Sequence, residues 1–343
     1  GFRRGKGWLY ALAGGLMILS LVLGMVISSV KISLAEIGAI LIHKLSGGSL
    51  FHTISPGTET IVWEIRLPRV LLAFGVGGAL ALSGAAFQGL LRNPLADPYT
   101  LGASSGAACG AVLVIFFQIN IFGLFTLPLF AILGGFATLV LVLALTRFTG
   151  RSSIEVLVLA GIIISAFISS VISLMIALSG EELRSILYWL FGSLSTRGWR
   201  YLLLFAPFFA VGVILLLIHH RDLNALTLGE EAAYHLGVDV KKRRGLILLA
   251  ASLLSGAAVA VSGTIGFVGL VIPHVVRLVA GPDHKHLLPL SVLVGGSFLV
   301  GADMVARSII APQELPVGVI TALIGAPIFA FLLFKTYYRK GVA

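Results

Sequence analysis

Apolar stretches of membrane-spanning length alternate with short charged segments along most of this chain. A helix needs about 20 apolar residues to cross a bilayer, so each stretch of that length predicts one span. Five stretches without a charged residue meet this length, at 7–30, 70–91, 156–180, 201–218 and 315–334. The first is longer than the roughly 7–15-residue apolar core of a signal peptide, and we therefore expect it to remain as a helix.

Three more stretches predict five further spans. Residues 98–146 contain no charge over 49 positions, which is enough for two spans with a turn near 118–120. Residues 245–276 are short for two full spans, yet a Ser-Gly-Thr sequence at 262–264 interrupts them, so we expect two abbreviated helices there. With one more span at 286–302, the pattern predicts ten membrane-spanning helices.

The distribution of Lys and Arg sets the orientation of these spans. An even number of spans puts both termini on one side of the membrane, and Lys and Arg accumulate in cytoplasmic loops. Of the 24 Lys and Arg residues, 16 fall on the side of the termini. We therefore expect both termini in the cytoplasm, and we attribute the net charge of +10 to these loops rather than to a nucleic-acid-binding surface.

The composition supports the same class of protein. Of 343 residues, 58% are hydrophobic and 11% are charged, against roughly 25% charged residues in soluble domains. A soluble fold of this length could not bury so much apolar surface in one core. The sequence therefore predicts an all-α polytopic membrane protein, in which residues 1–343 form a single membrane domain surrounded by lipid. Its one cysteine, Cys109, excludes an intrachain disulfide.

A short motif recurs within the apolar stretches. The sequence ALSG at 81–84 is followed after nine residues by Pro94, and AVSG at 260–263 is followed after nine residues by Pro273. The two copies end spans of opposite direction, as the copies of an inverted-topology repeat do in transporters. The alternative is a chance recurrence of small residues that favour tight helix packing. The predicted repeat halves are residues 64–180 and 243–335.

Few residues in this chain indicate catalysis or metal binding. Ser104 and Ser105 lie in an apolar stretch, but no His or Asp in another predicted span could complete a serine protease site. His284 and His286 flank Lys285 in a predicted cytoplasmic loop, and without acidic partners they indicate a solvated loop rather than a metal site. We expect no catalytic residue, metal or cofactor on this chain. No phosphate loop of the G-x-x-x-x-G-K type is present, so ATP would have to bind to another chain.

Charged residues within spans usually mark the route of an ion or a proton. Here Glu155, Arg277 and Asp303 lie near the ends of predicted spans, and almost no carboxylate lies deeper. This pattern argues against an ion-coupled secondary transporter that acts without an ATPase, which stays the alternative function.

The longest predicted cytoplasmic loop, residues 221–244, contains a short helical pattern at 226–237. Two glutamates fall in its first turn, where they favour the helix dipole, and a glycine ends it as a C-cap. Leucine and alanine at four-residue spacing form an apolar stripe that no membrane covers. Such a stripe packs against neighbouring helix ends or lies in a groove on a partner protein. The residues concerned are Leu228, Gly229, Glu230, Glu231, Ala232, Leu236 and Gly237.

Several motifs, each weak alone, occur in a fixed order over nearly the whole chain. They are IRLPR at 65–69, LSGA at 82–85, RNPLADP at 92–98, LG at 101–102, LGE at 228–230, LG at 236–237, GFVGLVIPH at 266–274, AD at 302–303, ELPVG at 314–318 and GAP at 325–327. Together they resemble the ABC-importer permeases for iron-siderophores, haem and vitamin B12, the FecCD or BtuC-like family. The resemblance runs from about Trp63 to Lys335.

This resemblance implies the fold of a type II ABC importer permease, with ten helices per subunit and a homodimer, or a pair with a close paralogue, around the pathway. It implies two cytosolic ATPase subunits that hold ATP and Mg, one extracytoplasmic binding protein, and no nucleic-acid partner. The chain would then be a transport subunit rather than an enzyme, in the cytoplasmic (inner) membrane of a bacterium or archaeon. Iron-siderophore is the first expected cargo, followed by haem and cobalamin.

The resemblance also implies three sites. The helix at 229–237 corresponds to the coupling helix that docks on the ATPase. Arg66 and Arg307 match outer-face arginines that meet acidic residues of the binding protein, and ordinary snorkelling arginines are the alternative. The third site is a cytoplasmic gate, formed by the loop after the second span and the start of the fifth span. At the start of the fifth span the B12 permease of the family carries small hydroxyl residues, whereas this chain has Glu155, and this difference leaves the role of Glu155 open. The gate residues implied are Asn93, Pro94, Leu95, Ile154 and Glu155.

Overall fold

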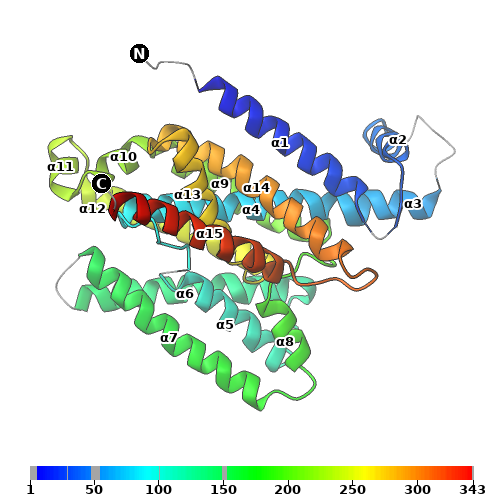
Figure 1. The fold of residues 1–343 in the computed structure, drawn as a ribbon. Helices are drawn as coiled ribbons and strands as arrows, with labels where there is room; N and C mark the ends of the chain where they lie inside the picture. Colours follow the sequence, from blue (N-terminus) through cyan, green and yellow to red (C-terminus); the bar gives the residue numbers. More distant parts are fainter. Residues whose placement is uncertain (1–5, 29, 48–54, 100, 149–152, 342–343) are drawn as a thin grey trace.

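Helices supply all the regular secondary structure in the part of the chain that the structure describes. The structure, a computed structural model, describes residues 6–28, 30–47, 55–99, 101–148 and 153–341, without the side chains of 333 and 335–341. Figure 1 shows long helices running roughly along one direction, with short helices at the two ends of the molecule.

Ten of these helices are apolar, one for each span that the sequence predicted. Seven are long enough to cross a membrane: α1 (Gly7–Val26), α4 (Leu67–Leu90), α6 (Thr126–Phe148), α7 (Ile154–Leu178), α9 (Trp199–Ile218), α12 (Val240–Ser262) and α14 (His284–Ser308). Two are shorter, α5 (Ala103–Phe116) and α13 (Val268–Ala280), and α15 (Val317–Gly341) is apolar over Val317–Leu332. The arrangement is compatible with the predicted ten spans.

The remaining helices are short and lie at the two ends of the molecule (Figure 1). One end carries α2 (Leu34–Leu45), α3 (Pro56–Thr60), η1 (Ile61–Arg66), η2 (Gly123–Phe125) and α8 (Leu183–Leu190). The other carries α10 (His220–Thr227) and α11 (Glu230–His235). We refer to these as the α2/α8 end and the α10/α11 end. The helices α3 and η1 continue directly into α4, so that one helical rod spans Pro56–Leu90.

Two predictions about span boundaries have different outcomes. The turn predicted near 118–120 is confirmed, because α5 ends at Phe116 and Gln118 takes a positive φ of 51°. The prediction of two abbreviated helices at 245–276 is wrong for the first of them, since α12 has 23 residues. The helix begins in a basic segment, where the Asp239 side chain caps it by accepting a hydrogen bond from the Lys242 main-chain N at 3.1 Å. Because its first turns contain charged residues, a count of apolar residues did not include them.

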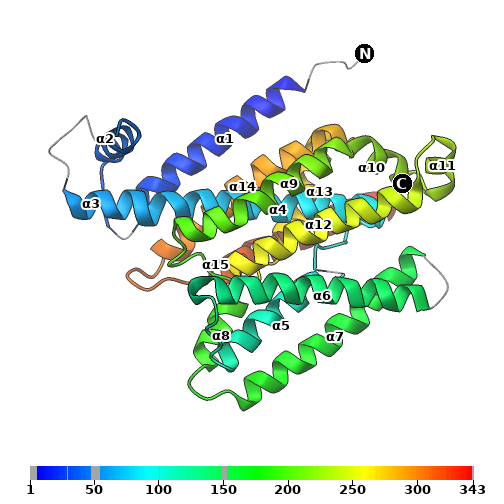
Figure 2. The same cartoon turned by 180° about the vertical axis from the view of Figure 1, so that it is seen from behind.

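The centre of the molecule is α4, in which almost every residue is buried. It lies between α14, α12, α13 and α9, as Figure 2 shows from behind. Small residues permit this close packing. A Cβ added to Gly77 would lie 2.3 Å from the Gly295 main-chain O on α14, and one added to Gly84 would lie 1.8 Å from the Gly269 main-chain O on α13. The small residues of the first repeat motif therefore serve helix packing, and the inverted repeat stays a prediction.

The outer helices present apolar side chains away from the rest of the chain. Leu159 and Phe167 on α7 and Leu203 on α9 are exposed by more than half of their surface. Soluble proteins rarely expose contiguous apolar patches of this kind. These faces fit lipid or a membrane partner, in agreement with the predicted class of protein.

Candidate functional site

The segment that resembles a coupling helix forms two helices where one was predicted. The break is at Gly229, whose φ of +113° ends α10 and starts α11. Leu228 is the C-terminal cap of α10 and is not on the helix that carries Leu236. The predicted single helix over 226–237 is therefore wrong in extent, because glycine allows a backbone conformation that a continuous helix excludes.

The C-terminal cap of this segment is confirmed. Gly237 takes a φ of +81°, and its N–H donates to the Tyr234 main-chain O at 2.9 Å. The N–H of Val238 donates to the Ala233 main-chain O at 3.0 Å, which completes a Schellman motif. Glu230 and Glu231 occupy the first turn of α11 as predicted, and Glu230 pairs with the Arg244 guanidinium on α12.

Three large apolar side chains on this segment point away from the protein. Leu228 is 68% exposed, Tyr234 72% and Leu236 64%, whereas Ala233 is fully buried. Ala232, the middle residue of the predicted stripe, is half-buried. The stripe therefore does not pack against neighbouring helix ends within this chain. We call Leu228, Tyr234 and Leu236 the coupling surface.

The predicted gate residues lie near this surface, at the α10/α11 end. Asn93, Pro94 and Leu95 are exposed in the turn after α4, where the Asn93 Oδ1 accepts a hydrogen bond from the Leu95 N–H at 2.9 Å. Ile154 and Glu155 begin α7, capped by Ser153. The role of Glu155 was the one most open from the sequence. Its carboxylate accepts hydrogen bonds from its own main-chain N–H and from the Ser153 side chain, and the charge of Arg92 has a smaller effect on it.

The loop between α4 and α5 turns back into the molecule. The Tyr99 hydroxyl donates to the Ile265 main-chain O at 2.6 Å and accepts from the Ile265 N–H at 3.0 Å, in the turn between α12 and α13. The Asp97 Oδ1 accepts from the Tyr99 N–H at 2.9 Å. Burial raises the pKa of the Asp97 carboxyl to about 6, and the hydrogen bond from Tyr99 partly opposes that shift. This anchored loop explains why α5 is shorter than a full span.

The two arginines expected to meet a binding protein are buried. Arg66 Nη1 donates to the Met25 main-chain O at 2.8 Å, and Arg66 Nη2 donates to the Val30 main-chain O. Arg307 Nη2 donates to the Gly24 main-chain O at 2.5 Å. The last carbonyls of a helix lack partners within it and favour a nearby cation. Both guanidinium groups therefore hold the end of α1, and neither is open to a partner in this conformation. Docking by these residues stays a prediction.

A buried charge cluster at the α2/α8 end was not found from the sequence. Arg69 on α4 donates to Asp303 on α14 through Nε and Nη2, at 2.8–3.2 Å. Arg69 Nη1 donates to the Glu314 Oε1 at 3.0 Å, and Arg307 Nε lies 3.7 Å from the Asp303 Oδ2. Partial burial raises the pKa of Glu314, but the hydrogen bond and charge of Arg69 outweigh burial and hold that pKa below its ordinary value.

Asp303 lies near the end of α14, as expected, but it is 1% exposed and is therefore an exception to the expected scarcity of buried carboxylates. Three hydrogen bonds from Arg69 keep it engaged, so it forms a buried ion pair with that arginine. The motifs IRLPR, AD and ELPVG each hold one member of the cluster, but their spacing does not indicate which side chains meet.

His284 also corrects an expectation. It was predicted in a solvated loop, but it is the first residue of α14 and is 2% exposed. Its main-chain N–H and its ring Nδ1 both meet the Asn224 Oδ1 on α10. His286 lies in the first turn of α14, 3.1 Å through Nδ1 from the Tyr10 hydroxyl. Among the described residues, no group of three or more His, Cys, Asp or Glu is placed to hold a metal ion.

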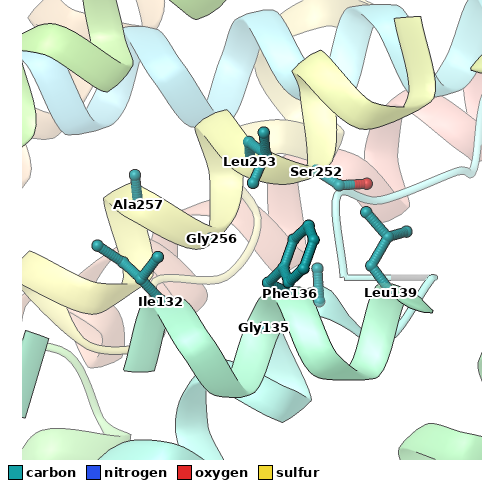
Figure 3. A pocket seen from close by; sticks show the side chains of 9 residues that line it. Ile132, Gly135, Phe136, Leu139, Ser252, Leu253, Gly256 and Ala257 are labelled. Atoms are coloured by element: carbon teal, nitrogen blue, oxygen red, sulfur yellow. The ribbon is translucent and has the colours of Figure 1, made fainter. Parts of the chain in front are cut away.

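Figure 3 shows a hollow between α6 and α12. Its space, including open solvent, is about 240 Å³, and apolar side chains such as Phe136 and Leu139 line it. Ser252 supplies the only polar side chain among its lining residues. Pockets for drug-sized ligands are about 300–1,000 Å³ and present several polar groups. This hollow is therefore a packing feature and not a site for a large cargo.

Comparison with known proteins places these features in context. Residues 16–335 match the model of the FecCD transport family. An uncharacterized ABC transporter permease, YvrB of Bacillus subtilis, is 50% identical over 96% of this chain and 94% of its own length. The cobalamin import permease BtuC of Halobacterium salinarum is 45% identical, over 80% of this chain and 73% of its own. The molybdate import permease MolB of Haemophilus influenzae is 41% identical over 93% of both chains.

A solved structure is also similar. It is described as a metal-chelate type ABC transporter in an inward-facing conformation, and it shares 38% identity with a TM-score of 0.83. The match covers 96% of this chain and 99% of that one. The all-helical permease fold expected from the motifs is confirmed by this likeness.

Proposed function

The chain belongs to the FecCD transport family of ABC-importer permeases, and from this premise we propose that it carries a metal chelate inward through the cytoplasmic membrane. Iron-siderophore is the first candidate cargo, with haem and cobalamin next. The proposed assembly has two copies of this chain, or this chain and a close paralogue. Two ATPase subunits hold ATP and Mg, and one binding protein delivers the cargo. Both termini lie in the cytoplasm.

The observation that carries the proposal is the coupling surface. Leu228, Tyr234 and Leu236 are exposed on a segment that is too polar and too short to enter the membrane. Burial of one such side chain contributes about 1.5–3 kcal/mol, so three of them can anchor a partner protein. We assign this partner as the ATPase, with Gly229, Glu230, Glu231, Ala232 and Gly237 shaping the segment that it contacts.

ATP hydrolysis on the ATPase subunit docked at that surface would open and close a gate at the same end of the molecule. The proposed gate residues are Asn93, Pro94, Leu95, Ile154 and Glu155. A pathway for a large chelate works best when its lining binds weakly, because a tight site would trap the cargo. Docking of the binding protein on Arg66 and Arg307 would require both side chains to release the carbonyls at the end of α1.

The names of the relatives widen the range of cargo to be tested. One relative is named for cobalamin and another for molybdate, which is a small oxyanion and not a chelate. The alternative function is an ion-coupled secondary transporter that acts without an ATPase. The engagement of Asp303 by Arg69 disfavours that alternative, because a coupling carboxylate must release and rebind its ion.

Uptake into proteoliposomes tests the proposal. The vesicles hold this chain with its ATPase, and they receive the binding protein with labelled ferric siderophore, haem, cobalamin or molybdate, with and without ATP. We expect ATP-dependent entry of one chelate. Entry of molybdate alone would keep the importer and replace the cargo class. Entry that ignores ATP and follows an ion gradient would contradict the proposal and support the secondary transporter.

A further inference from the structure

His284, at the start of α14, is a buried polar residue whose burial neither the gate nor the coupling surface explains. Asn224 on α10 accepts a hydrogen bond through Oδ1 from the His284 main-chain N–H at 2.9 Å, and the same oxygen lies 2.8 Å from the His284 Nδ1. Asn224 Nδ2 donates to the Asp283 Oδ1 at 2.8 Å. One side chain of α10 thus makes three hydrogen bonds to two consecutive residues at the start of another helix.

These hydrogen bonds determine which ring nitrogen of His284 carries the proton. Asn224 donates to Asp283 through its amide nitrogen, so the Asn224 Oδ1 can only accept, and the His284 Nδ1 must donate to it. The other nitrogen, Nε2, is buried and has no hydrogen-bond partner among the described residues. A Cβ added to Gly89 would lie 2.5 Å from this Nε2 and 3.5 Å from Leu223 Cδ2 of α10. The start of α14 and α10 are therefore packed directly on the last turn of α4.

Arg92, the second residue after α4, lies near the segment of α10 and α11. Arg92 takes a φ of 51°, a conformation that is strained for a non-glycine residue. Its Nη1 lies 3.6 Å from the position of a Cβ on Gly229, at the break between α10 and α11. The next residues along the chain are the proposed gate residues Asn93–Leu95. The end of α4 therefore packs against α10 immediately before the gate, and Arg92 lies beside the break between α10 and α11.

We propose that Asn224 and His284 clamp α10 to the start of α14, which packs on the end of α4, so that the coupling surface and the gate loop 91–95 move as one rigid unit. Hydrogen bonds of this number and geometry fix the direction of α10, whereas apolar packing alone would allow it to slide. Asn224 is a positioning residue, because it acts through its hydrogen bonds to Asp283 and His284. The meaning of that movement for transport rests on the proposed function, but the clamp itself does not.

Hydrogen–deuterium exchange of the purified full chain tests the clamp without any transport assay. Asn224→Ala removes all three hydrogen bonds, and Asn224→Asp keeps the size but cannot donate to Asp283. Asn120→Ala, an exposed asparagine in the turn after α5, is the matched control. We expect exchange to rise about fivefold or more in both 283–287 and 87–96 for each Asn224 variant, and more for Asn224→Ala, which loses three bonds, than for Asn224→Asp, because the loss of one hydrogen bond changes an opening equilibrium about fivefold. A rise confined to 283–287 would overturn the clamp.

A second measurement, in the reconstituted complex, tests whether the clamp transmits movement from the coupling surface to the gate loop. Asn224→Ala and His284→Ala should each lower uptake per ATP hydrolysed about fivefold or more while the ATPase rate is retained. The double variant should be no worse than either single variant, because both act through one contact. If the losses of the two single variants add in the double variant, or if uptake per ATP hydrolysed is unchanged, the clamp does not transmit this movement. Absence of ATP-dependent uptake in the unmodified chain would instead refute the proposed function, and the exchange pattern would still decide the clamp.

Discussion

Asp303→Asn tests how much the buried charge cluster at the α2/α8 end stabilises the fold. Asp303 is 1% exposed and accepts three hydrogen bonds from Arg69. Asparagine keeps the shape but removes the charge, so Arg69 and Arg307 lose the carboxylate that lies between them. Breaking a buried ion pair by removing one partner costs about 3–5 kcal/mol, because the other charge stays buried without compensation.

The remaining contacts of the cluster place the expected loss at the lower end of this range. Glu314 Oε1 accepts from Arg69 Nη1 at 3.0 Å, so Arg69 keeps one carboxylate partner. Arg307 keeps its hydrogen bond to the Gly24 main-chain O at 2.5 Å. We therefore expect Asp303→Asn to lower the free energy of unfolding by about 3 kcal/mol.

Unfolding by SDS in mixed micelles measures this free energy. Glu314→Gln is the matched control, because the Glu314 side chain is 30% exposed and its loss should cost about 1 kcal/mol or less. The double variant Arg69→Met, Asp303→Leu should cost less than Asp303→Asn, since it removes both charges of the pair. A loss for Asp303→Asn no larger than that for Glu314→Gln would refute the reasoning.

Three further predictions concern other parts of the chain. Leu236→Asp should weaken binding of the ATPase about tenfold or more without changing the thermal midpoint, since the side chain is 64% exposed, and equal binding would contradict the coupling surface. Asp97→Asn should raise the free energy of unfolding at pH 7.5 by up to about 3 kcal/mol and leave it unchanged near pH 3, because the raised pKa of about 6 means that the folded protein favours protonated Asp97 and loses stability as the pH rises from 3.8 through 6. Thermal scans across pH measure this, and an equal gain at both pH values would contradict it. Gly84→Ala should prevent stable folding, because its Cβ would lie 1.8 Å from the Gly269 main-chain O. In contrast, the Cβ of Gly256→Ala would meet no atom within 4 Å, and this variant should stabilise α12 by up to about 1 kcal/mol; size-exclusion chromatography and thermal scans compare the two variants.

The apolar stretches predicted the spans because membrane helices are set by length and hydropathy, which are local properties. The same logic failed at α12, where the four charged residues after Val240 form part of the helix and were assigned to a loop. It also failed at Gly229, because a pattern of four-residue spacing does not reveal that one position has a backbone conformation outside the helix. Local patterns therefore gave the number of helices better than their boundaries.

The polar contacts that join distant helices were not predictable from the sequence. Arg69 and Asp303 are 234 residues apart, and Asn224 and His284 are 60 residues apart. Each residue has several possible partners of the right chemistry, and only the packing of the helices selects one. For the same reason, Arg66 was expected at the surface, although its guanidinium is buried against the end of α1.

The anchoring of α1 by these arginines has a consequence for biosynthesis. Arg66 is made 41 residues after Met25, but Arg307 is made 283 residues after Gly24. At roughly 5–20 residues per second, the ribosome reaches Arg307 roughly 15–60 s after Gly24. Until then the last turn of α1 has only part of its anchor, so a nascent chain interrupted before α14 would carry an incompletely docked α1. Although α1 is the first of the described helices to be translated, it gains its last arginine contact only after Arg307 in α14 has been made. Complete docking of α1 therefore requires that synthesis has reached the end of α14.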